Sequence, residues 1–559
     1  MKLSGAEIIL KSLIEKNVDV VFGYPGGANI PLYNALYDYS KKIKHILVRH
    51  EQGAAHAAEG YARSSGKPGV CFATSGPGAT NLVTGIADAM IDSIPLVCIT
   101  GQVAAHLIGS DAFQEINIIE ITKPITKWNI QVTKVDQIEN AIHTAFQRAT
   151  SGRPGPVLID IARSAQLEYG EYRENVSKKY EANILPIDQK ILKKAAELLN
   201  NAKKPLIIAG HGTLISKAGK ELLSLVNTTG APLASTLLGL SAFPQSHNHY
   251  VGMVGMHGNY APNVLTNEAD VILAIGMRFD DRVTSTLSTY APQAKIIHID
   301  IDAREINKNI KGVVPILSDA KGALNQLLPL LQLRSHREWL SEFNKKKKIE
   351  YDSIIQKQTH PKAGKILMAE VVNTLSELTK GKSIIVADVG QNQMMTARYY
   401  CFESFDHFFT SGGLGTMGFS LPAAVGAHYG NKKEHVIAIM GDGGFQMNIQ
   451  ELGTIMQEKI PLKIIILNNG FLGMVRQWQQ LFFEKRYSFT PMQNPDFVAV
   501  GKAYGIKSKK IYKRTQLIKA LKEMLNFNGS YLLEIDVERE GNVFPMIAPG
   551  SSVSQIRLS

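Results

Sequence analysis

Two short stretches late in the chain carry oxygen-bearing side chains directly after apolar runs. Asp442 follows the run 436–440, within Gly441-Asp442-Gly443-Gly444, and Asn469 follows the run 462–467. We expect both runs to be buried parallel strands, with a crossover helix at 449–459 between them. The loops after such strands meet at one end of the sheet, so the carboxylate and the amide oxygen come together. Hard oxygen ligands beside a glycine-rich turn suit Mg²⁺ that holds a diphosphate.

The separation of these two side chains favours a metal site over a simpler explanation. A surface turn and a strand-end asparagine would supply the same residue types, but the loop glycines, the flanking strands and the spacing all agree with metal binding. The main-chain carbonyl of Phe471, two residues after Asn469, offers a third protein ligand. The arrangement resembles the magnesium–diphosphate signature of thiamine diphosphate enzymes.

Glu51 begins a glycine- and alanine-rich segment, 49–63, which predicts a closely packed helix. A carboxylate that is hydrogen-bonded to an aminopyrimidine favours its imino tautomer, the base that activates a thiazolium carbon. The helix dipole alone also favours an acid in a first helical turn. Because the same chain carries the diphosphate motif, we expect Glu51 to be the catalytic carboxylate.

Two other loops of the N-terminal segment offer groups that can contact a substrate. Gly27 lies in the turn Tyr24-Pro25-Gly26-Gly27-Ala28, whose main-chain N–H groups can stabilise an oxyanion, although a tight turn alone would explain the composition. Phe113 and Gln114 lie in a polar loop, where Gln114 is either a ligand of the substrate or an ordinary loop amide. Both loops are candidate parts of a substrate site.

The middle of the chain contains a candidate dinucleotide site. Gly210 and Gly212 follow one apolar run, Arg278 follows another, and Asp300 and Asp319 lie near strand ends. Glycine loops after strands accommodate diphosphates, and an acid after a strand can bind a ribose hydroxyl. An ordinary helix start would contain the same glycines, so the motif is not specific by itself.

Three sheets are needed to position these residues. Apolar runs alternate with helical patterns in three segments, which predicts an α/β protein with three doubly wound parallel-sheet domains. The outer two segments look like copies of one architecture around a different middle domain. The expected domains are 1–165, 188–340 and 363–540, with linkers at 166–187 and 341–362 and a C-terminal tail of little periodicity at 541–559.

The overall composition is that of a globular protein. The chain has 559 residues, 45% of them apolar and 20% charged, and no apolar stretch long enough to span a membrane. Its three cysteines form no close pair and its N-terminus carries no signal, so we expect a cytoplasmic protein, or a plastid stroma protein in an alga or plant. The net charge of +12 suits anionic ligands. The lysines are too scattered for nucleic-acid binding, and the run 345–348 is interpreted as a solvated helix end or linker.

Nearly the whole chain resembles the catalytic subunits of acetohydroxyacid synthase (acetolactate synthase). The resemblance implies a transferase that uses thiamine diphosphate, Mg²⁺ and FAD, although the redox chemistry of FAD is not needed. Such an enzyme decarboxylates pyruvate and transfers the hydroxyethyl (acetaldehyde) group to a second pyruvate or to 2-oxobutanoate. The products, 2-acetolactate and 2-aceto-2-hydroxybutanoate, feed valine, leucine and isoleucine biosynthesis. The matching stretches are 24–28, 49–63, 75–81, 111–115, 151–156, 278–283, 411–422, 441–447 and 467–478.

The resemblance also implies catalytic and substrate-binding roles. Glu51 would contact the pyrimidine ring, Gly27 would lie near the thiazolium, and Gln114 would contact the intermediate. Met417 would wedge the cofactor into its bent shape. The acceptor 2-oxo acid would meet Arg282 through its carboxylate and Trp478 through its side chain, with Phe113 as a further contact.

The cofactor ligands follow from the same resemblance. Mg²⁺ would be held by Asp442, Asn469 and the carbonyl of Phe471. The diphosphate would be held by Val389, Gly390, Gln391, Asn392, Gly441, Gly443 and Gly444. FAD would be held by Arg153, Gly210, Gly212, Arg278, Asp300 and Asp319.

Two positions depart from the family pattern. Asn392 stands where the family usually has histidine, so affinity for the diphosphate is in doubt. Ala162-Arg163-Ser164 stands where the family often has Pro-Lys-Asp, which puts substrate entry and inhibitor sensitivity in doubt. Neither change affects Glu51, Asp442 or Asn469.

Several alternatives are weighed against this interpretation. A glyoxylate carboligase is expected to lack Glu51, a catabolic acetolactate-forming enzyme to lack the FAD motifs and Trp478, and a non-catalytic subunit to lose Glu51 or Asp442. A pyruvate oxidase would use FAD as an electron carrier. In the family the active site lies between two copies, so the resemblance implies a homodimer or tetramer and a small regulatory subunit as partners, with no role for nucleic acid or membrane.

Overall fold

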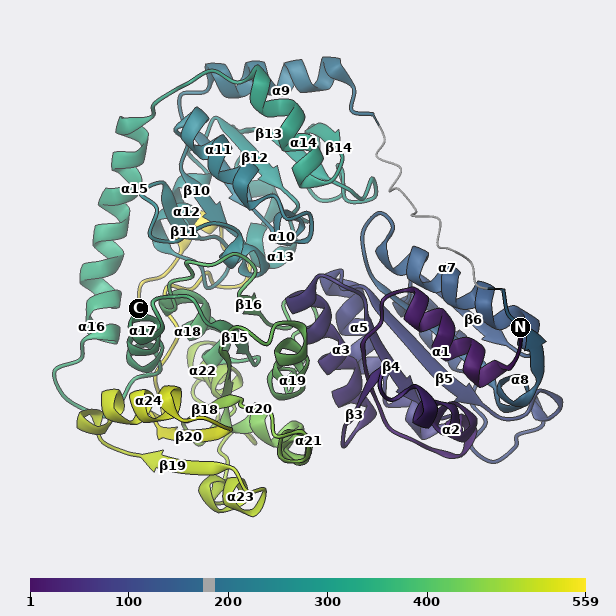
Figure 1. The fold of residues 1–559 in the computed structure, drawn as a ribbon. Coiled ribbons are helices and arrows are strands. Elements are labelled where there is room, and N and C mark those ends of the chain that lie inside the picture. Colours follow the sequence, from purple (N-terminus) through teal and green to yellow (C-terminus); the bar gives the residue numbers. More distant parts are fainter. Residues whose placement is uncertain (174–185) are drawn as a thin grey trace.

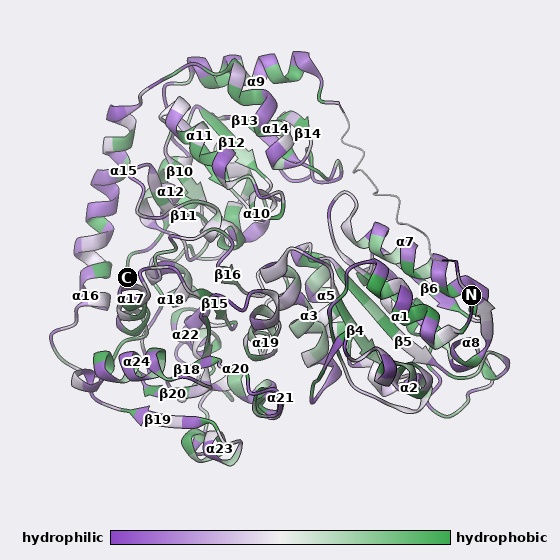
Figure 2. Ribbon diagram, viewed as in Figure 1, coloured by the Kyte–Doolittle hydropathy of each residue, from purple (hydrophilic) through white to green (hydrophobic). Residues whose placement is uncertain are grey.

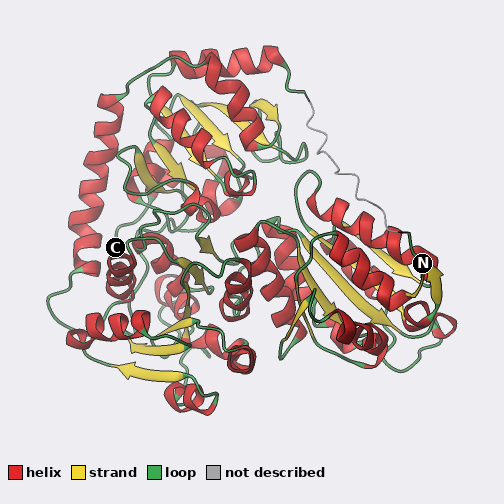
Figure 3. Ribbon diagram, viewed as in Figure 1, coloured by secondary structure: helices red, strands yellow, loops and turns green. Residues whose placement is uncertain are grey.

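Three separate six-stranded parallel sheets form the framework of the protein in a computed structural model, which describes residues 1–173 and 186–559 (Figure 1). We call them the sheets of the first, middle and third domains, in chain order. Helices cover both faces of each sheet, as the red and yellow elements of Figure 3 show. The expected α/β class with three doubly wound domains is therefore confirmed. No helix in the described part of the chain has the length and apolar character to cross a membrane.

The first domain has strand order β3-β2-β4-β5-β7-β6, and all neighbours are parallel. Its central strands are fully buried apolar runs, as expected of a sheet covered on both faces. The strands are β2 Val20–Gly23, β3 Lys44–Leu47, β4 Gly69–Ala73, β5 Leu96–Gln102, β6 Trp128–Val132 and β7 Pro156–Ala162; the helices are α1 Gly5–Glu15, α2 Ile30–Tyr39, α3 Glu51–Ser65, α4 Pro77–Thr80, α5 Val83–Asp92, α6 Ile118–Thr122, α7 Ile138–Thr150 and α8 Arg163–Leu167.

The middle domain has strand order β11-β10-β9-β12-β13-β14. Strands β10 and β11 are added on one side of β9, and β12 to β14 are added on its other side. The carboxyl ends of β9 and β12 are therefore a topological switch point. The strands are β9 Pro205–Ala209, β10 Leu233–Ser235, β11 Tyr250–Met253, β12 Val271–Ile275, β13 Lys295–Asp300 and β14 Val314–Leu317; the helices are α9 Gln189–Asn201, α10 His211–Ile215, α11 Gly219–Thr229, α12 Tyr260–Thr266, α13 Asp281–Thr284, α14 Ala320–Leu327, α15 Arg337–Glu350 and α16 Gln356–Thr359.

The third domain has strand order β16-β15-β17-β18-β20-β19, and β17 lies next to β18 as the spacing of Asp442 and Asn469 predicts. The expected crossover at 449–459 forms a short 3-10 turn and then α21. The strands are β15 Ile384–Ala387, β16 Phe408–Phe409, β17 Val436–Gly441, β18 Lys463–Asn468, β19 Lys507–Ile511 and β20 Tyr531–Asp536; the helices are α17 Met368–Thr379, α18 Gln391–Tyr399, α19 Ser420–Gly430, α20 Asp442–Met447, α21 Leu452–Glu458, α22 Gly473–Phe482, α23 Phe497–Ala503 and α24 Leu517–Asn526.

The first and third domains meet through helices α3 and α19, which lie side by side in Figure 1. A Cβ atom on Gly60 would lie 1.9 Å from the main-chain oxygen of Ala423, and one on Gly426 would lie 1.7 Å from that of Ala57. Only glycine permits two helix backbones to approach this closely. The small residues of 49–63 therefore serve the contact between domains, as the predicted close packing requires.

The expected linker at 341–362 is wrong. Residues 337–359 form one helical run, α15, a wider turn at Tyr351–Ile355 and α16, which crosses the middle domain along its outer side in Figure 1. The run is polar (purple in Figure 2), but Trp339, Phe343 and Ile354 recur on its buried side and hold it to the domain. The lysines 345–348 lie in the last turns of α15, where Lys347 is bound to the main-chain oxygen of Tyr250.

The expected linker at 166–187 also needs correction, whereas the tail at 541–559 contains one short 3-10 turn, Val553–Gln555, in keeping with its low periodicity. Strand β8, Tyr169–Glu171, pairs antiparallel with β1, Lys2–Ser4, so the first domain continues past residue 165; residues 174–185 lie outside the described part. The tail packs against the middle domain, where Ile547 donates its N–H to the oxygen of Met256 at 2.8 Å. The tail lacks periodicity because it lies over other elements rather than forming a sheet or long helix of its own.

Candidate active site

One cavity of about 990 Å³ lies where the three domains meet, and it collects most of the predicted site residues. Its lining comes from all three domains, so the site depends on how the domains pack. The predicted residues that line it are Arg153, Gly212, Arg278, Arg282, Asp300, Asp319, Val389, Gly390, Gln391, Asn392, Met417, Gly441, Gly443, Gly444, Asn469, Phe471 and Trp478. Gly210 and Asp442 lie beside lining residues, whereas Gly27, Glu51, Phe113 and Gln114 are not part of this lining.

Asp442 has one carboxylate oxygen available for a ligand. The side chain is 1% exposed, its Oδ2 accepts a hydrogen bond of 2.6 Å from Asn494, and its Oδ1 is buried with no partner within the described chain. Burial raises the pKa of Asp442 to about 6. A buried carboxylate oxygen without a partner raises the free energy of the folded state unless a cation or a hydrogen-bond donor binds it. Asp442 is therefore suited to bind a hard metal ion.

Asn469 and Phe471 follow the neighbouring strand β18. The amide oxygen of Asn469 accepts the N–H of Phe471 at 3.2 Å, which folds the two residues into a compact turn, and its Nδ2 lies 3.4 Å from Oε1 of Gln391. Both residues are buried and line the cavity. The turn therefore places oxygen-bearing groups at the same sheet edge as Asp442, whose strand β17 is paired with β18.

A glycine loop precedes helix α18 at the same edge. Gly390 has a φ of 130°, a conformation that favours glycine, and caps the helix with no side chain in the way. Asn392 donates to the main-chain oxygen of Asp388 at 2.7 Å, and its Oδ1 lies between Gly390 and Gly441. The open main chain of 389–390 and 441–444 thus faces the cavity from two sides, an arrangement suited to a diphosphate.

The middle domain contributes a close approach of two glycine turns. Gly212 donates its N–H to the oxygen of Gly276 at 3.0 Å, and a Cβ on Gly210 would lie 2.3 Å from the same oxygen. Asp300 and Asp319 follow β13 and β14; Asp319 caps α14 through Gly322, and burial raises the pKa of Asp300 to about 6. These features lie at the switch point of the sheet, where doubly wound domains bind ligands.

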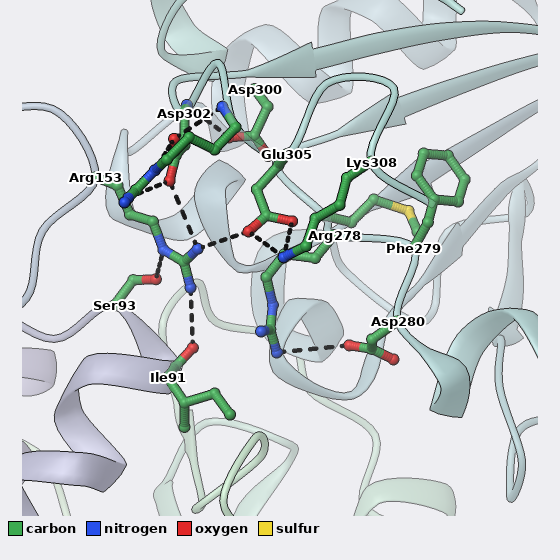
Figure 4. A network of polar contacts seen from close by, with 12 residues as sticks. Ile91, Ser93, Arg153, Arg278, Phe279, Asp280, Asp300, Asp302, Glu305 and Lys308 are labelled. Atoms are coloured by element: carbon green, nitrogen blue, oxygen red, sulfur yellow. Dashed lines mark hydrogen bonds and ion pairs between the residues drawn. The ribbon is translucent and has the colours of Figure 1, made fainter. Parts of the chain in front are cut away.

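Arg153 connects the first and middle domains across this part of the cavity (Figure 4). Its guanidinium lies 3.1 Å from Glu305 and 3.8 Å from Asp302, and it donates to Ser93 at 2.8 Å and to the oxygen of Ile91 at 3.2 Å. The side chain of Glu305 is only 6% exposed. The Arg153 guanidinium therefore neutralises the buried carboxylate of Glu305 and holds the first and middle domains at a fixed spacing.

Arg282 and Trp478 line the same cavity from different domains. Arg282 keeps most of its side chain exposed, 3.6 Å from Asp281, with Nη1 3.4 Å from the sulfur of Met256. Trp478 lies on α22, which Arg476 and Gln477 hold against the C-terminal tail. A cation and an indole facing one cavity can bind a small acid that carries an apolar side chain.

Glu51, Gly27 and Gln114 gather instead around the loop after β4. Glu51 is 9% exposed and accepts a hydrogen bond of 2.9 Å from Asn81, and a Cβ on Gly76 would lie 3.0 Å from Gln114. Gly27 has open space on its side-chain side, and Phe113 is 89% exposed. The first-domain residues thus form a second cluster, at the carboxyl edge of their own sheet.

Sequence reasoning missed several supporting residues. Asn494 contacts Asp442 from a distant loop, and Asp388 accepts N–H bonds from Gly418 and Ser420 on either side of Phe419. His257 lines the cavity, and burial lowers its pKa to about 3. The sequence spacing of these residues does not connect them to the motifs. Only Asp388 could have been suspected, because it directly follows a buried apolar run, as the other candidate ligands do.

Comparison with known proteins places three family profiles along the chain. The profiles described as thiamine pyrophosphate enzyme N-terminal TPP binding domain, central domain and C-terminal TPP binding domain match residues 3–121, 192–327 and 388–535. The chain is 43% identical to the acetolactate synthase isozyme 2 large subunit of Escherichia coli, covering 99% of both proteins. It is 44% identical to a probable acetolactate synthase large subunit of Methanocaldococcus jannaschii, covering 99% of this chain and 95% of the other. It is also 44% identical to the acetolactate synthase large subunit of Lactococcus lactis, covering 98% and 95%.

Proposed function

Since the chain belongs to the thiamine pyrophosphate enzyme family, among its acetolactate synthase large subunits, we propose that it joins two 2-oxo acids. Pyruvate is decarboxylated, and the two-carbon unit is transferred to a second pyruvate or to 2-oxobutanoate, as required for valine, leucine and isoleucine biosynthesis. The observation that carries this proposal is the single cavity lined both by the open glycine loops at 389–390 and 441–444 and by Arg282 and Trp478.

The residues at the third-domain edge suit thiamine diphosphate held through Mg²⁺. The orphaned Oδ1 of Asp442, the amide of Asn469 and the carbonyl of Phe471 are hard oxygen groups of the kind that Mg²⁺ takes. The main chain at Gly390, Gln391, Gly441 and Gly443, which lines the cavity, would hold the phosphates. When bound, the cofactor would supply the electron sink that takes up the electron pair released by decarboxylation. Asn392 offers a neutral amide at this edge, and that amide already donates to the main-chain oxygen of Asp388.

The middle domain suits FAD as a structural cofactor. Gly210 and Gly212 form the close turn that a diphosphate needs, and Arg153, Arg278, Asp300 and Asp319 surround the adjoining part of the cavity. No step of the proposed reaction uses electrons from a flavin. We therefore assign FAD the role of filling and ordering the cavity between the domains.

The position of Glu51 supports an active site shared by two copies. Glu51, Gly27 and Gln114 do not line the cavity that holds Asp442 and Met417 of the same chain, yet the chemistry needs the carboxylate beside the cofactor. In a symmetric dimer the first-domain cluster of one copy meets the third-domain edge of the other. Glu51 would then hold a proton beside the pyrimidine, Gly27 would offer its main chain, and Gln114 would orient the substrate. The relatives are named large subunits, so a small regulatory subunit is a further proposed partner.

Incubation of the purified protein with pyruvate, thiamine diphosphate, Mg²⁺ and FAD tests the proposal. The expected result is 2-acetolactate, with carbon dioxide released and no oxygen consumed; adding 2-oxobutanoate should yield the mixed product. Oxygen consumption in step with pyruvate loss would instead identify an oxidase. Formation of free acetaldehyde without a ligated product would identify a decarboxylase.

A further inference from the structure

The loop Ser411–Gly418 needs external support to hold Met417 in place. Four of its eight residues are glycine, and Gly413, Leu414 and Gly415 are exposed. Such a segment is flexible by composition. Met417 nevertheless lines the cavity, with its terminal methyl group near Gly443, where a Cβ would lie 3.5 Å away. The side chains that fix this loop therefore control where Met417 lies.

Asp92, at the end of helix α5 in the first domain, receives two successive main-chain donors of this loop. Gly412 donates its N–H to Oδ2 at 2.9 Å, and Gly413 donates to Oδ1 at 2.8 Å. Asp92 is 2% exposed and is also bound by Arg63 at 2.8 Å. Both oxygens of a buried, charge-balanced carboxylate are thus used, which fixes the start of the loop in distance and orientation.

Asp88, one turn earlier on α5, reaches the loop through a second path. The hydroxyl of Ser411 donates to Asp88 Oδ1 at 2.6 Å and accepts the N–H of Thr416 at 2.8 Å. This chain of bonds closes the loop on itself, one residue before Met417. Asp88 is fully buried, so its contact with Ser411 is shielded from water.

A third carboxylate, from within the third domain, fixes the far end of the loop. Asp388 accepts the N–H of Gly418 at 3.0 Å with Oδ1 and that of Ser420 at 3.0 Å with Oδ2. Met417 is thus held between an anchor in its own domain and two anchors from the first domain. Contact between the domains alone would not require main-chain bonds to this loop, because α3 and α19 already join them closely.

We propose that Asp92 and Asp88 are positioning residues, which set the location of Met417 in the cavity by holding the loop 411–416 from the first domain. The inference rests on the proposed function, in which Met417 shapes the bound cofactor. It goes further by assigning control of that contact to a different domain: Asp88 is not part of the cavity lining, and Asp92 lines the cavity with both carboxylate oxygens already bound by the loop and Arg63. In this scheme Asp92 and Asp88 act on the reaction through the loop that carries Met417.

The test compares Asp92→Asn with Glu59→Gln in the full-length protein. Glu59 is fully buried in the same cluster and binds His56, but it makes no bond to the loop. In Asp92→Asn we expect the amides of 412–416 to exchange hydrogen roughly tenfold faster, with turnover lowered about 10- to 100-fold. The KM for pyruvate and the affinity for thiamine diphosphate with Mg²⁺ should stay within about threefold, because the diphosphate ligands are unchanged. Glu59→Gln should match the wild type in loop exchange.

Ser411→Ala keeps the inference testable if Asp92→Asn does not fold. It removes only the hydroxyl between Asp88 and Thr416, so faster exchange at 416 with lowered turnover supports the inference. Unchanged exchange in both variants would overturn it, as would an equal loss of turnover in Glu59→Gln. Hydrogen exchange and cofactor binding do not depend on which reaction is catalysed. A wild-type protein that makes no 2-acetolactate would therefore refute the proposed function, and the exchange measurements would still show whether Asp92 and Asp88 anchor the loop.

Discussion

Asn494 donates a hydrogen bond of 2.6 Å to one carboxylate oxygen of Asp442 and leaves the other oxygen buried without a partner in the described chain. Gln446 in turn holds the oxygen of Asn494 at 2.9 Å, so the orientation of the carboxylate is fixed from behind. A ligand that is oriented in this way loses less freedom when a metal binds. Asn494 would thus act on the proposed metal site without being a ligand itself.

Asp442→Asn is expected to abolish most Mg²⁺-dependent binding of thiamine diphosphate, and Asn494→Ala to weaken it about 10- to 100-fold. The first change removes the charge of a ligand, and the second removes only its orientation. Titration of the apo-protein with cofactor at several Mg²⁺ concentrations, followed by intrinsic fluorescence, measures both. Gln450→Ala is the control, because Gln450 binds Asn448 and touches neither residue. Equal weakening in all three variants would point to general destabilisation rather than to the metal site.

The sequence predicted the strands that lead into candidate site residues better than the edge strands and the surface helix. The expected strands at 436–440 and 462–467 match β17 and β18 to within one residue, because buried parallel strands are short unbroken apolar runs. Edge strands such as β19, with sequence Lys-Ser-Lys-Lys-Ile, carry polar residues and gave no such signal. The helix at 337–359 was mistaken for a linker because only a few side chains on its inner face are apolar.

The site residues also fall into a group that the sequence could place and a group that it could not. Motifs that lie directly after strands, such as Asp442 and Asn469, could be placed together from topology alone. Asn494, Asp92 and Asp88 act through contacts between segments far apart in the chain, and no periodicity brings them together. Sequence reasoning also could not show that Glu51 lies outside the cavity of its own chain, because that depends on how the domains pack.

Arg153→Met is expected to lower FAD retention at least about tenfold and to destabilise the protein. The change leaves the buried Glu305 with Lys308 as its remaining cation, at 3.2 Å, and a buried carboxylate that loses a partner costs several kcal/mol. Arg304→Met is the matched control: Arg304 binds Asp302 at 2.8 Å but its side chain is 78% exposed, so about 0–1 kcal/mol is expected. Flavin absorbance per chain after dialysis and the thermal midpoint measure both effects. Equal flavin loss in the two variants would remove Arg153 from the FAD site.

Trp478→Leu is expected to lower the preference for 2-oxobutanoate over pyruvate as acceptor by about tenfold, because contact with one methylene is worth about 1–3 kcal/mol. The ratio of the two products, with both acids present, measures the preference directly. Phe483→Leu makes a similar truncation at a residue that is 60% exposed and does not line the cavity. The product ratio should not change in that control. An unaltered ratio in Trp478→Leu would place the acceptor elsewhere.

Asp160 should make the first domain less stable as the pH rises from about 4 to about 6. The residue is fully buried, bound by Thr100, Gln102 and Gln131, and burial raises its pKa from 3.8 to about 6. The folded state therefore holds a proton that the unfolded state releases, and up to about 3 kcal/mol of stability is lost across that window. Asp160→Asn cannot titrate, so its thermal midpoint relative to the wild type should rise by on the order of 5 °C between pH 4.5 and 7.5. Asp136→Asn, at an exposed position, should show no such trend, and a constant difference for Asp160→Asn would contradict the assignment.

Mixing two inactive variants tests the shared active site most directly. Glu51→Gln should bind thiamine diphosphate but lose most turnover, because the carboxylate at the pyrimidine is gone, and Asp442→Asn should lose the metal-held cofactor. If each site takes Glu51 from one copy and Asp442 from the other, a mixed dimer has one site with both changes and one site with neither. Unfolding and refolding an equal mixture should therefore restore about a quarter of the wild-type activity, since half of the randomly formed dimers are mixed. Each variant treated alone is the control and should stay inactive. If each copy instead built its own complete site, the mixture would recover nothing, and the separation of Glu51 from the cavity would need another explanation.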